Sequence, residues 1–128
     1  MSQFRIKTLD HVALRVSNLE SSAQWYEQVL GLQRLQPKEW GPFPIFMVTE
    51  DGTGVALFPA RKNSAVPIPK GDHYAFQVEQ QQFEKAQEHL RSQGVAFEFQ
   101  DHYYHHSIYF QDPDGHQLEI TTQVKPFN

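Results

Sequence analysis

The stretch His11-Val-Ala-Leu-Arg-Val16 returns 62 residues later as His73-Tyr-Ala-Phe-Gln-Val78. In both stretches a histidine opens a run in which apolar side chains alternate with other residues, the pattern of a β-strand with one buried face. Nearly the same spacing, 63 and 61 residues, separates two pairs of glycines, Gly31 from Gly94 and Gly54 from Gly115. An internal duplication is the simplest account of three landmarks that recur at nearly one spacing.

The pattern of the first half predicts a βαβββ module over about residues 4–59. A strand is expected from Phe4 to Val16, followed by a helix with Asn18 as its N-cap and Gly31 at its end. Short β-prone runs then predict three strands, over residues 32–35, 45–49 and 55–58. The Asp51-Gly52 pair supplies a turn before the last of these strands.

The second half repeats this order after a polar, proline-containing connector at residues 60–71. A helix is expected from Phe83 to Leu90, with Gly94 as its stop, inside a second module over about residues 72–123. Three further strands are predicted over residues 97–100, 107–110 and 117–122, with a tight turn at Asp112-Pro-Asp-Gly115 before the last. Residues 1–128 are therefore expected to form a single α+β domain of curved sheets.

Composition narrows the classes of function. A chain of 128 residues can bury one hydrophobic core without stabilising cross-links. The absence of cysteine excludes disulfides, thiolate zinc sites and a cysteine nucleophile. Any metal must therefore take nitrogen and oxygen ligands. No apolar run approaches the ~20 residues of a membrane span or forms a signal peptide, so a cytoplasmic protein without a membrane partner is expected. A formal charge of -4, with no cluster of Lys or Arg, argues against nucleic acid as a partner.

Three metal-capable side chains are predicted to lie on the sheet faces that point away from the helices. Alternation along a strand turns His11 and His73 away from the apolar residues that pack against the helices. In the last strand Leu118 and Ile120 pack inward, which leaves Glu119 on the opposite face. Two imidazoles and one carboxylate form the facial set that suits iron(II) and related ions and leaves positions open for substrate.

A plainer interpretation also fits these residues. A single strand histidine is more often hydrogen-bonded or solvated than bound to metal. Recurrence at equivalent positions of a duplicated unit favours a shared site, although a duplicated structural polar pair fits as well. Of the adjacent residues His105 and His106, alternation lets only one share the ligand face.

These residues carry a resemblance to the vicinal oxygen chelate superfamily, which covers the chain from Leu9 to Thr122. The similar features are the Leu-Asp-His11 start of a strand, Trp25-Tyr26, Leu30-Gly31-Leu32, His73, and the stretch Tyr109-Phe-Gln-Asp-Pro-Asp-Gly-His-Gln-Leu-Glu119. The resemblance implies paired βαβββ modules that form a curved eight-stranded cup, a metal bound inside it, and often a homodimer. It implies His11, His73 and Glu119 as the metal ligands.

Within this superfamily, glyoxalase I enzymes use a fourth protein ligand on the last strand of the first half. Aligning Gly54 with Gly115 places Phe58 at the position that corresponds to Glu119. A phenyl ring cannot bind an ion, so a three-ligand site is favoured over the glyoxalase I arrangement.

The extradiol ring-cleaving dioxygenases, which use two histidines and a glutamate on iron(II), match more closely. Their signature has a tyrosine ten residues before the glutamate, as Tyr109 is here, and a preceding histidine, for which His102 has a permitted spacing. Gln100 departs from the small or β-branched residue of that signature, and most of these enzymes are about twice as long. Tyr109 is expected to donate a hydrogen bond to a substrate oxyanion and His102 to move a proton, while a packed strand aromatic is the alternative for Tyr109.

Two other classes remain. Fosfomycin-resistance thiol transferases resemble the chain through Ser107-Ile-Tyr109-Phe and the same three ligands, but their phosphonate calls for cations, and no Lys or Arg occurs between Gly94 and Val124. Bleomycin-resistance proteins share the architecture as metal-free binding modules. The favoured expectation is a metal-dependent, dioxygenase-like oxidoreductase or lyase for a small chelating substrate, with Fe2+ preferred and Mn2+, Zn2+ or Ni2+ as alternatives.

Overall fold

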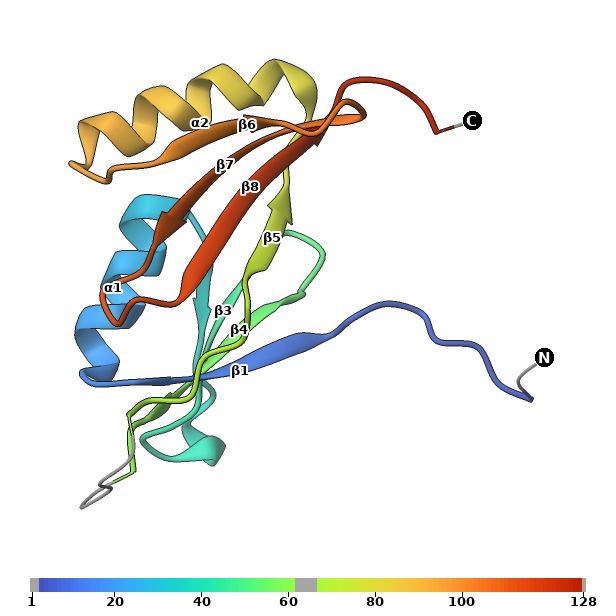
Figure 1. Ribbon diagram of the computed structural model, residues 1–128. Helices are drawn as coiled ribbons and strands as arrows, with labels where there is room; N and C mark the ends of the chain where they lie inside the picture. The colour runs from blue at the N-terminus through green and yellow to red at the C-terminus, as the bar shows by residue number, and fades with distance from the viewer. Residues whose placement is uncertain (1–2, 62–66, 128) are drawn as a thin grey trace. The chain divides into compact units, whose positions relative to one another are not determined.

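The computed structural model describes residues 3–61 and 67–127, and the chain divides into two compact units between Pro69 and Lys70 (Figure 1). Within the described residues there are two α-helices and eight strands, arranged as two four-stranded sheets. The predicted α+β class, with one helix and four strands in each half, is confirmed. Neither helix in the described ranges has the length and hydrophobicity needed to cross a bilayer.

The first unit has the element order β-α-β-β-β. Its elements are β1 (His11–Val16), α1 (Leu19–Leu30), β2 (Gln33–Leu35), a short 3-10 helix (Lys38–Trp40), β3 (Ile45–Val48) and β4 (Gly54–Pro59). The sheet order is β1-β4-β3-β2, in which β1 and β4 run parallel and the other pairs antiparallel. This arrangement places the strand that carries His11 beside the last strand of the unit.

Helix α1 forms where the sequence predicts it, because both of its ends are capped. The Asn18 side chain accepts a hydrogen bond from the Ser21 backbone N–H at 2.9 Å, and Gly31 ends the helix with φ 66°. The buried face of α1 includes Ala23 and Tyr26, both 0% exposed. Burial of this apolar face against the sheet supplies most of the stability of the helix.

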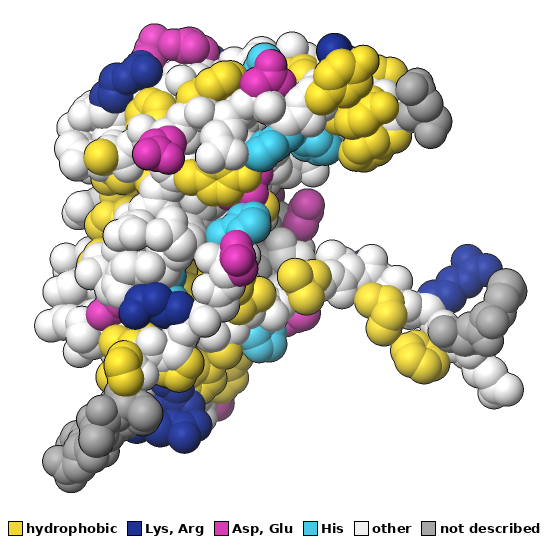
Figure 2. All heavy atoms as spheres, viewed as in Figure 1, with side chains coloured by type: hydrophobic (Ala, Val, Ile, Leu, Met, Phe, Trp, Pro, Cys, Tyr) yellow, Lys and Arg dark blue, Asp and Glu magenta, His cyan; other side chains and the backbone are white. Residues whose placement is uncertain are grey.

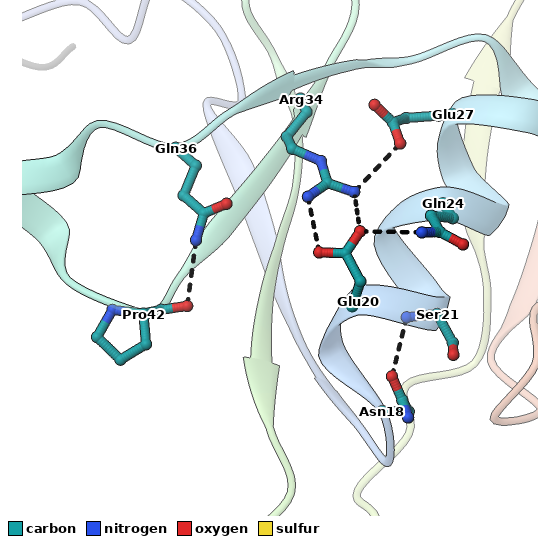
Figure 3. Close-up of polar contacts among 8 residues, drawn as sticks. All are labelled: Asn18, Glu20, Ser21, Gln24, Glu27, Arg34, Gln36 and Pro42. Atoms are coloured by element: carbon teal, nitrogen blue, oxygen red, sulfur yellow. Dashed lines mark hydrogen bonds and ion pairs between the residues drawn. The ribbon is translucent and has the colours of Figure 1, made fainter.

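An ion-pair cluster joins α1 to the edge strand β2 (Figure 3). The Arg34 guanidinium donates to both carboxylate oxygens of Glu20, at 2.9 and 2.6 Å, and to Glu27 at 3.2 Å. The hydrogen bond from Arg34 lowers the pKa of Glu20. In the next loop, the Gln36 side chain donates to the Pro42 carbonyl at 3.3 Å. These contacts hold a three-residue edge strand in place without adding to the core.

The second unit repeats the first. Its elements are β5 (Tyr74–Gln77), α2 (Gln80–Ser92), β6 (Glu98–Asp101), β7 (His105–Gln111) and β8 (Gln117–Gln123). The sheet order β5-β8-β7-β6, again with its first pair parallel, reproduces the topology of the first sheet. Two units with the same order and the same strand directions are what an internal duplication predicts.

The core of the second unit lies between α2 and its sheet. Leu90 of α2 is 1% exposed, and Ile108, Leu118 and Ile120 are buried on the strands. The turn before β8 has the predicted form, in which the Gly115 N–H donates to the Asp112 carbonyl at 3.0 Å with φ 85° at the glycine. Because Leu118 and Ile120 face α2, Glu119 between them faces the other side of the sheet.

The first strand is shorter than predicted. Strand β1 begins at His11 rather than Phe4, because its register with β4 starts at the His11 and Gly54 pair and residues 3–10 pair with no strand of the described part of the chain. Phe4, Ile6 and Leu9 are 69%, 77% and 73% exposed. Figure 2 shows hydrophobic side chains along this N-terminal segment. Residues 60–61 and 67–71 of the expected connector contain no helix or strand, and residues 62–66 lie outside the described residues.

Candidate metal-binding site

The centre of the candidate site is a histidine and carboxylate pair in the second unit. His73 immediately precedes β5, and Glu119 lies in the middle of β8, opposite Ala75 in the register. The His73 Nε2 and Glu119 Oε1 atoms are 3.1 Å apart. Neighbouring donor atoms on one ion, with bonds of ~2.1 Å at right angles, are also separated by ~3 Å. The pair is therefore spaced as two ligands of one metal ion would be.

Asp72 orients the His73 ring. The Asp72 Oδ1 atom lies 2.6 Å from His73 Nδ1, which places the Nδ1 proton on the Asp72 side and turns Nε2 toward Glu119. This hydrogen bond, together with the negative charge of Glu119, raises the pKa of His73. A carboxylate behind the imidazole fixes the tautomer whose Nε2 lone pair is available to a metal.

A buried hydroxyl orients Glu119 in the same way. The Ser107 Oγ atom donates to Glu119 Oε2 at 2.6 Å and lies 2.9 Å from the Thr121 Oγ1 atom. Ser107 is 0% exposed and Glu119 is 7% exposed, so the carboxylate is held in a protected position with its Oε1 atom toward His73. The donor set and its supporting contacts fit a divalent ion that takes nitrogen and oxygen ligands.

His11 in the first unit has a matching environment. Its Nδ1 atom lies 2.7 Å from Asp10 Oδ2, and its ring lies 5.0 Å from the Phe46 ring. The His73 ring lies 5.7 Å from the Tyr109 ring. In both units, an aspartate thus precedes the histidine and binds its Nδ1 atom, while an aromatic ring lies against the imidazole.

The strand registers correct the expected counterpart of Glu119. Ala75 pairs with Glu119 in the second unit, and the equivalent residue Ala13 pairs with Ala56 in the first. The counterpart of Glu119 is therefore Ala56 and not Phe58, because the glycine-based alignment misplaced the strand by two residues. Ala56 has no donor atom, so the preference for a three-ligand site is unchanged.

Tyr109 and His102 lie beside the ligand pair. The Tyr109 hydroxyl and the His102 Nε2 atom are 2.9 Å apart, and Tyr109 pairs with Glu119 in the register of β7 and β8. Burial, followed by the charge of Glu119, raises the pKa of Tyr109. The hydroxyl therefore stays protonated at neutral pH and is available as a hydrogen-bond donor.

His105 and His106 lie on opposite faces of β7, as alternation predicts. His106 packs against the rings of Phe83 and Phe99, at 6.4 and 5.3 Å, on the side of helix α2. His105 lies 5.6 Å from the Phe127 ring and shares the strand face of Ser107 and Tyr109.

The structure brings together some of the predicted site residues. In the second unit, Glu119 is close to His73 and Tyr109, and Tyr109 is hydrogen-bonded to His102. No group of three or more His, Asp or Glu side chains suited to a metal occurs within residues 3–61 and 67–127, and His11 belongs to the first unit. The three-ligand set of His11, His73 and Glu119 remains a prediction.

Sequence reasoning missed the residues that support the ligands. Asp10 and Asp72 directly precede the two histidines, so the repeated Asp-His pair was a usable signal. Ser107 belongs to the Ser107-Ile-Tyr109-Phe motif, and alternation places it on the same strand face as Tyr109.

Comparison with known proteins agrees with this architecture. The family model of the glyoxalase/bleomycin resistance protein/dioxygenase superfamily matches residues 8–120. The chain is 32% identical over 117 residues to the glutathione transferase FosA of Serratia marcescens. That alignment covers 90% of this chain and 80% of FosA. It is 28% identical over 118 residues to the catechol-2,3-dioxygenase of Bacillus subtilis (strain 168), which covers 88% of this chain and 40% of that protein.

A solved structure extends the comparison to three dimensions. An integron cassette protein from the mobile metagenome of a Halifax Harbour sewage outfall is 31% identical, with a TM-score of 0.74. The match covers 91% of this chain and 99% of that one. The duplicated units and the family match together show that the chain belongs to the glyoxalase/bleomycin resistance protein/dioxygenase superfamily, the vicinal oxygen chelate proteins.

Proposed function

We propose that this protein is a metal-dependent enzyme whose small substrate chelates the ion through two adjacent oxygen atoms. The single observation that carries this proposal is the pair of His73 and Glu119, 3.1 Å apart, with Asp72 on the far nitrogen of the imidazole. His11 would be the third ligand. Fe2+ is the favoured ion, and Mn2+, Zn2+ or Ni2+ would accept the same donors.

The test of a metal site is direct. Protein purified without chelators is analysed for metal and then titrated with each of the four ions. Binding of one ion per chain supports the proposal. A protein that holds no metal and takes up none would instead be a metal-free ligand-binding module, like the bleomycin-resistance proteins of this superfamily.

Within this class we favour a ring-cleaving dioxygenase type of reaction. When bound, the ion would act as a Lewis acid on the substrate oxygens and offer a position for a second reactant. Tyr109 would donate a hydrogen bond to the substrate oxyanion, and His102, 2.9 Å from the Tyr109 hydroxyl, would accept or return a proton.

A series of aromatic rings in the first unit supports an aromatic substrate. In the first unit the rings of Trp40, Phe46 and His11 form a continuous series, with centroid distances of 4.8 and 5.0 Å. A planar ring could stack on such a surface. Oxygen uptake with catechols, compared between the native protein and the Tyr109→Phe and His102→Gln variants, tests this assignment. Uptake that both variants leave unchanged contradicts the proposed roles.

A second candidate is a thiol transferase of the fosfomycin-resistance type. The 32% identity to the Serratia marcescens glutathione transferase favours it. Against it, residues 95–123 contain no Lys or Arg, so this part of the chain supplies no cation to a phosphonate. Incubation of the metal-loaded protein with fosfomycin and glutathione distinguishes the two reactions, because a thiol adduct would form only with a transferase.

We also infer a homodimer. The exposed Phe4, Ile6 and Leu9 side chains support it, since three large apolar residues on one segment are costly to leave in water. Analytical ultracentrifugation of the native chain and of a chain that begins at residue 10, which lacks all three side chains, tests this inference. A monomer in both cases contradicts it.

The expected cytoplasmic location stays a prediction that cell fractionation can test.

A further inference from the structure

We infer that Ser107 is a positioning residue that makes Glu119 bind a metal through one oxygen only, so that a coordination position stays free for a second reactant. This inference rests on the metal site proposed above. It concerns a residue that makes no contact with the ion itself. Its basis is the hydrogen-bond pattern around the two oxygens of one carboxylate.

The two carboxylate oxygens of Glu119 have different partners. The Oε1 atom lies 3.1 Å from His73 Nε2, on the side where a metal would bind. The Oε2 atom accepts the 2.6 Å hydrogen bond from Ser107, within the range of O–H bonds to an ionised carboxylate. One oxygen is thus directed to the metal position, while the other is bound to a fully buried strand residue.

The positions of the hydroxyl protons also assign the Glu119 Oε2 atom to Ser107. A serine hydroxyl has one proton to donate, and the 2.6 Å contact with Glu119 uses it. The Thr121 hydroxyl lies 2.9 Å from Ser107 Oγ and 3.4 Å from the His106 carbonyl oxygen. Thr121 donates its own proton to the His106 carbonyl, and the single Ser107 proton goes to the shorter contact, which is the one with the Glu119 carboxylate.

The consequence follows from counting coordination positions. Under the proposed function, two imidazoles and one carboxylate oxygen would take three of the six positions of an octahedral ion. A substrate that chelates through two oxygens takes two more, which leaves a single position for oxygen or a thiol. A bidentate Glu119 would fill that last position and block the second reactant.

A purely structural role for Ser107 makes a different prediction. The hydroxyl also satisfies a buried carboxylate, which would otherwise be costly, so loss of stability in a variant does not distinguish the roles. The number of water molecules on the bound ion does distinguish them. Only a positioning role changes that number.

The experiment uses Mn2+ as the probe, since EPR in isotopically labelled water counts the waters bound to it. The native protein, Ser107→Ala and the hydroxyl-retaining variant Ser107→Thr are compared in the absence of substrate. We expect one water fewer on Mn2+ in Ser107→Ala and the native number in Ser107→Thr. Thr121→Val is the matched control on the neighbouring strand, and it should keep the native number because Ser107 still donates.

The outcomes separate this inference from the proposed function. An unchanged water count in Ser107→Ala overturns the positioning role while leaving the metal site intact. Failure of the native protein to bind Mn2+, Fe2+, Zn2+ or Ni2+ overturns both. Should Ser107→Ala fail to fold, Ser107→Cys has a similar volume with a much weaker donor, and it should show the same loss of one water.

Discussion

The paired aspartates behind the two histidines allow a quantitative test of the metal site. Asp72→Asn removes the carboxylate that lies 2.6 Å from His73 Nδ1, and Asp10→Asn removes its counterpart at 2.7 Å from His11 Nδ1. Loss of such a carboxylate typically weakens metal binding 10- to 100-fold. Because both aspartates are largely exposed to water, we expect the lower end, about 10-fold for each variant.

The two effects should multiply. Each aspartate orients a different histidine, and the two share no hydrogen-bond partner among the contacts described above, so to a first approximation their free-energy changes should add. The double variant is therefore expected to bind about 100-fold more weakly, or ~2.7 kcal/mol, than the native protein.

Metal affinity is measured by competition with a chromophoric chelator, with Asp51→Asn as a control in an exposed turn. Native affinity in Asp72→Asn would refute the role of the pair. An effect of Asp72→Asn without one of Asp10→Asn would remove His11 from the ligand set.

Three further outcomes are expected. His73→Ala should lose most of the metal affinity. Its circular dichroism should stay native, because the His73 side chain is 40% exposed and lies outside the core. An unchanged metal content would count heavily against the site. Glu20→Gln should lower the melting temperature at neutral pH but have little effect in acid. The pKa of Glu20 is lowered in the folded protein, so ionised Glu20 stabilises the fold above its unfolded pKa of ~4.3, and this stabilisation is lost as the pH falls through the folded pKa. An equal loss at both pH values would contradict the ion pair with Arg34. Gly54→Ala should destabilise by about 1–3 kcal/mol or more in urea titrations, because a Cβ there meets the Met47 backbone carbonyl, and native stability would show that β4 can shift.

Much of the fold could be predicted because its signals are local. The N-cap at Asn18, the glycine at position 31 and the alternation around Leu118 and Ile120 each depend on a few neighbouring residues. The duplication then assigned the same order of elements to both halves. A strand boundary is different, because it depends on a partner strand, and residues 3–10 have strand-like composition without one.

The site was harder to predict because it depends on register between strands. Identifying Ala56 as the counterpart of Glu119 required the pairing of β1 with β4. The alignment of Gly54 with Gly115 placed that counterpart two residues too late, at Phe58. The contact of Ser107 with Glu119 likewise joins two strands across twelve residues of sequence. Alternation assigns a residue to a face, whereas only register decides which residues of that face touch.

The registers also indicate how the two units have come to differ. Phe46 pairs with Ala56 in the first unit, where the second unit has Tyr109 opposite Glu119. Both units keep the Asp-His pair with an aromatic ring against the imidazole, but only the second adds a carboxylate and a hydroxyl. Under the proposed function, the first unit contributes one imidazole and an apolar surface for the substrate. The second unit contributes the remaining ligands and the groups that exchange protons, so that substitutions in the first should alter substrate choice and those in the second should alter the reaction itself.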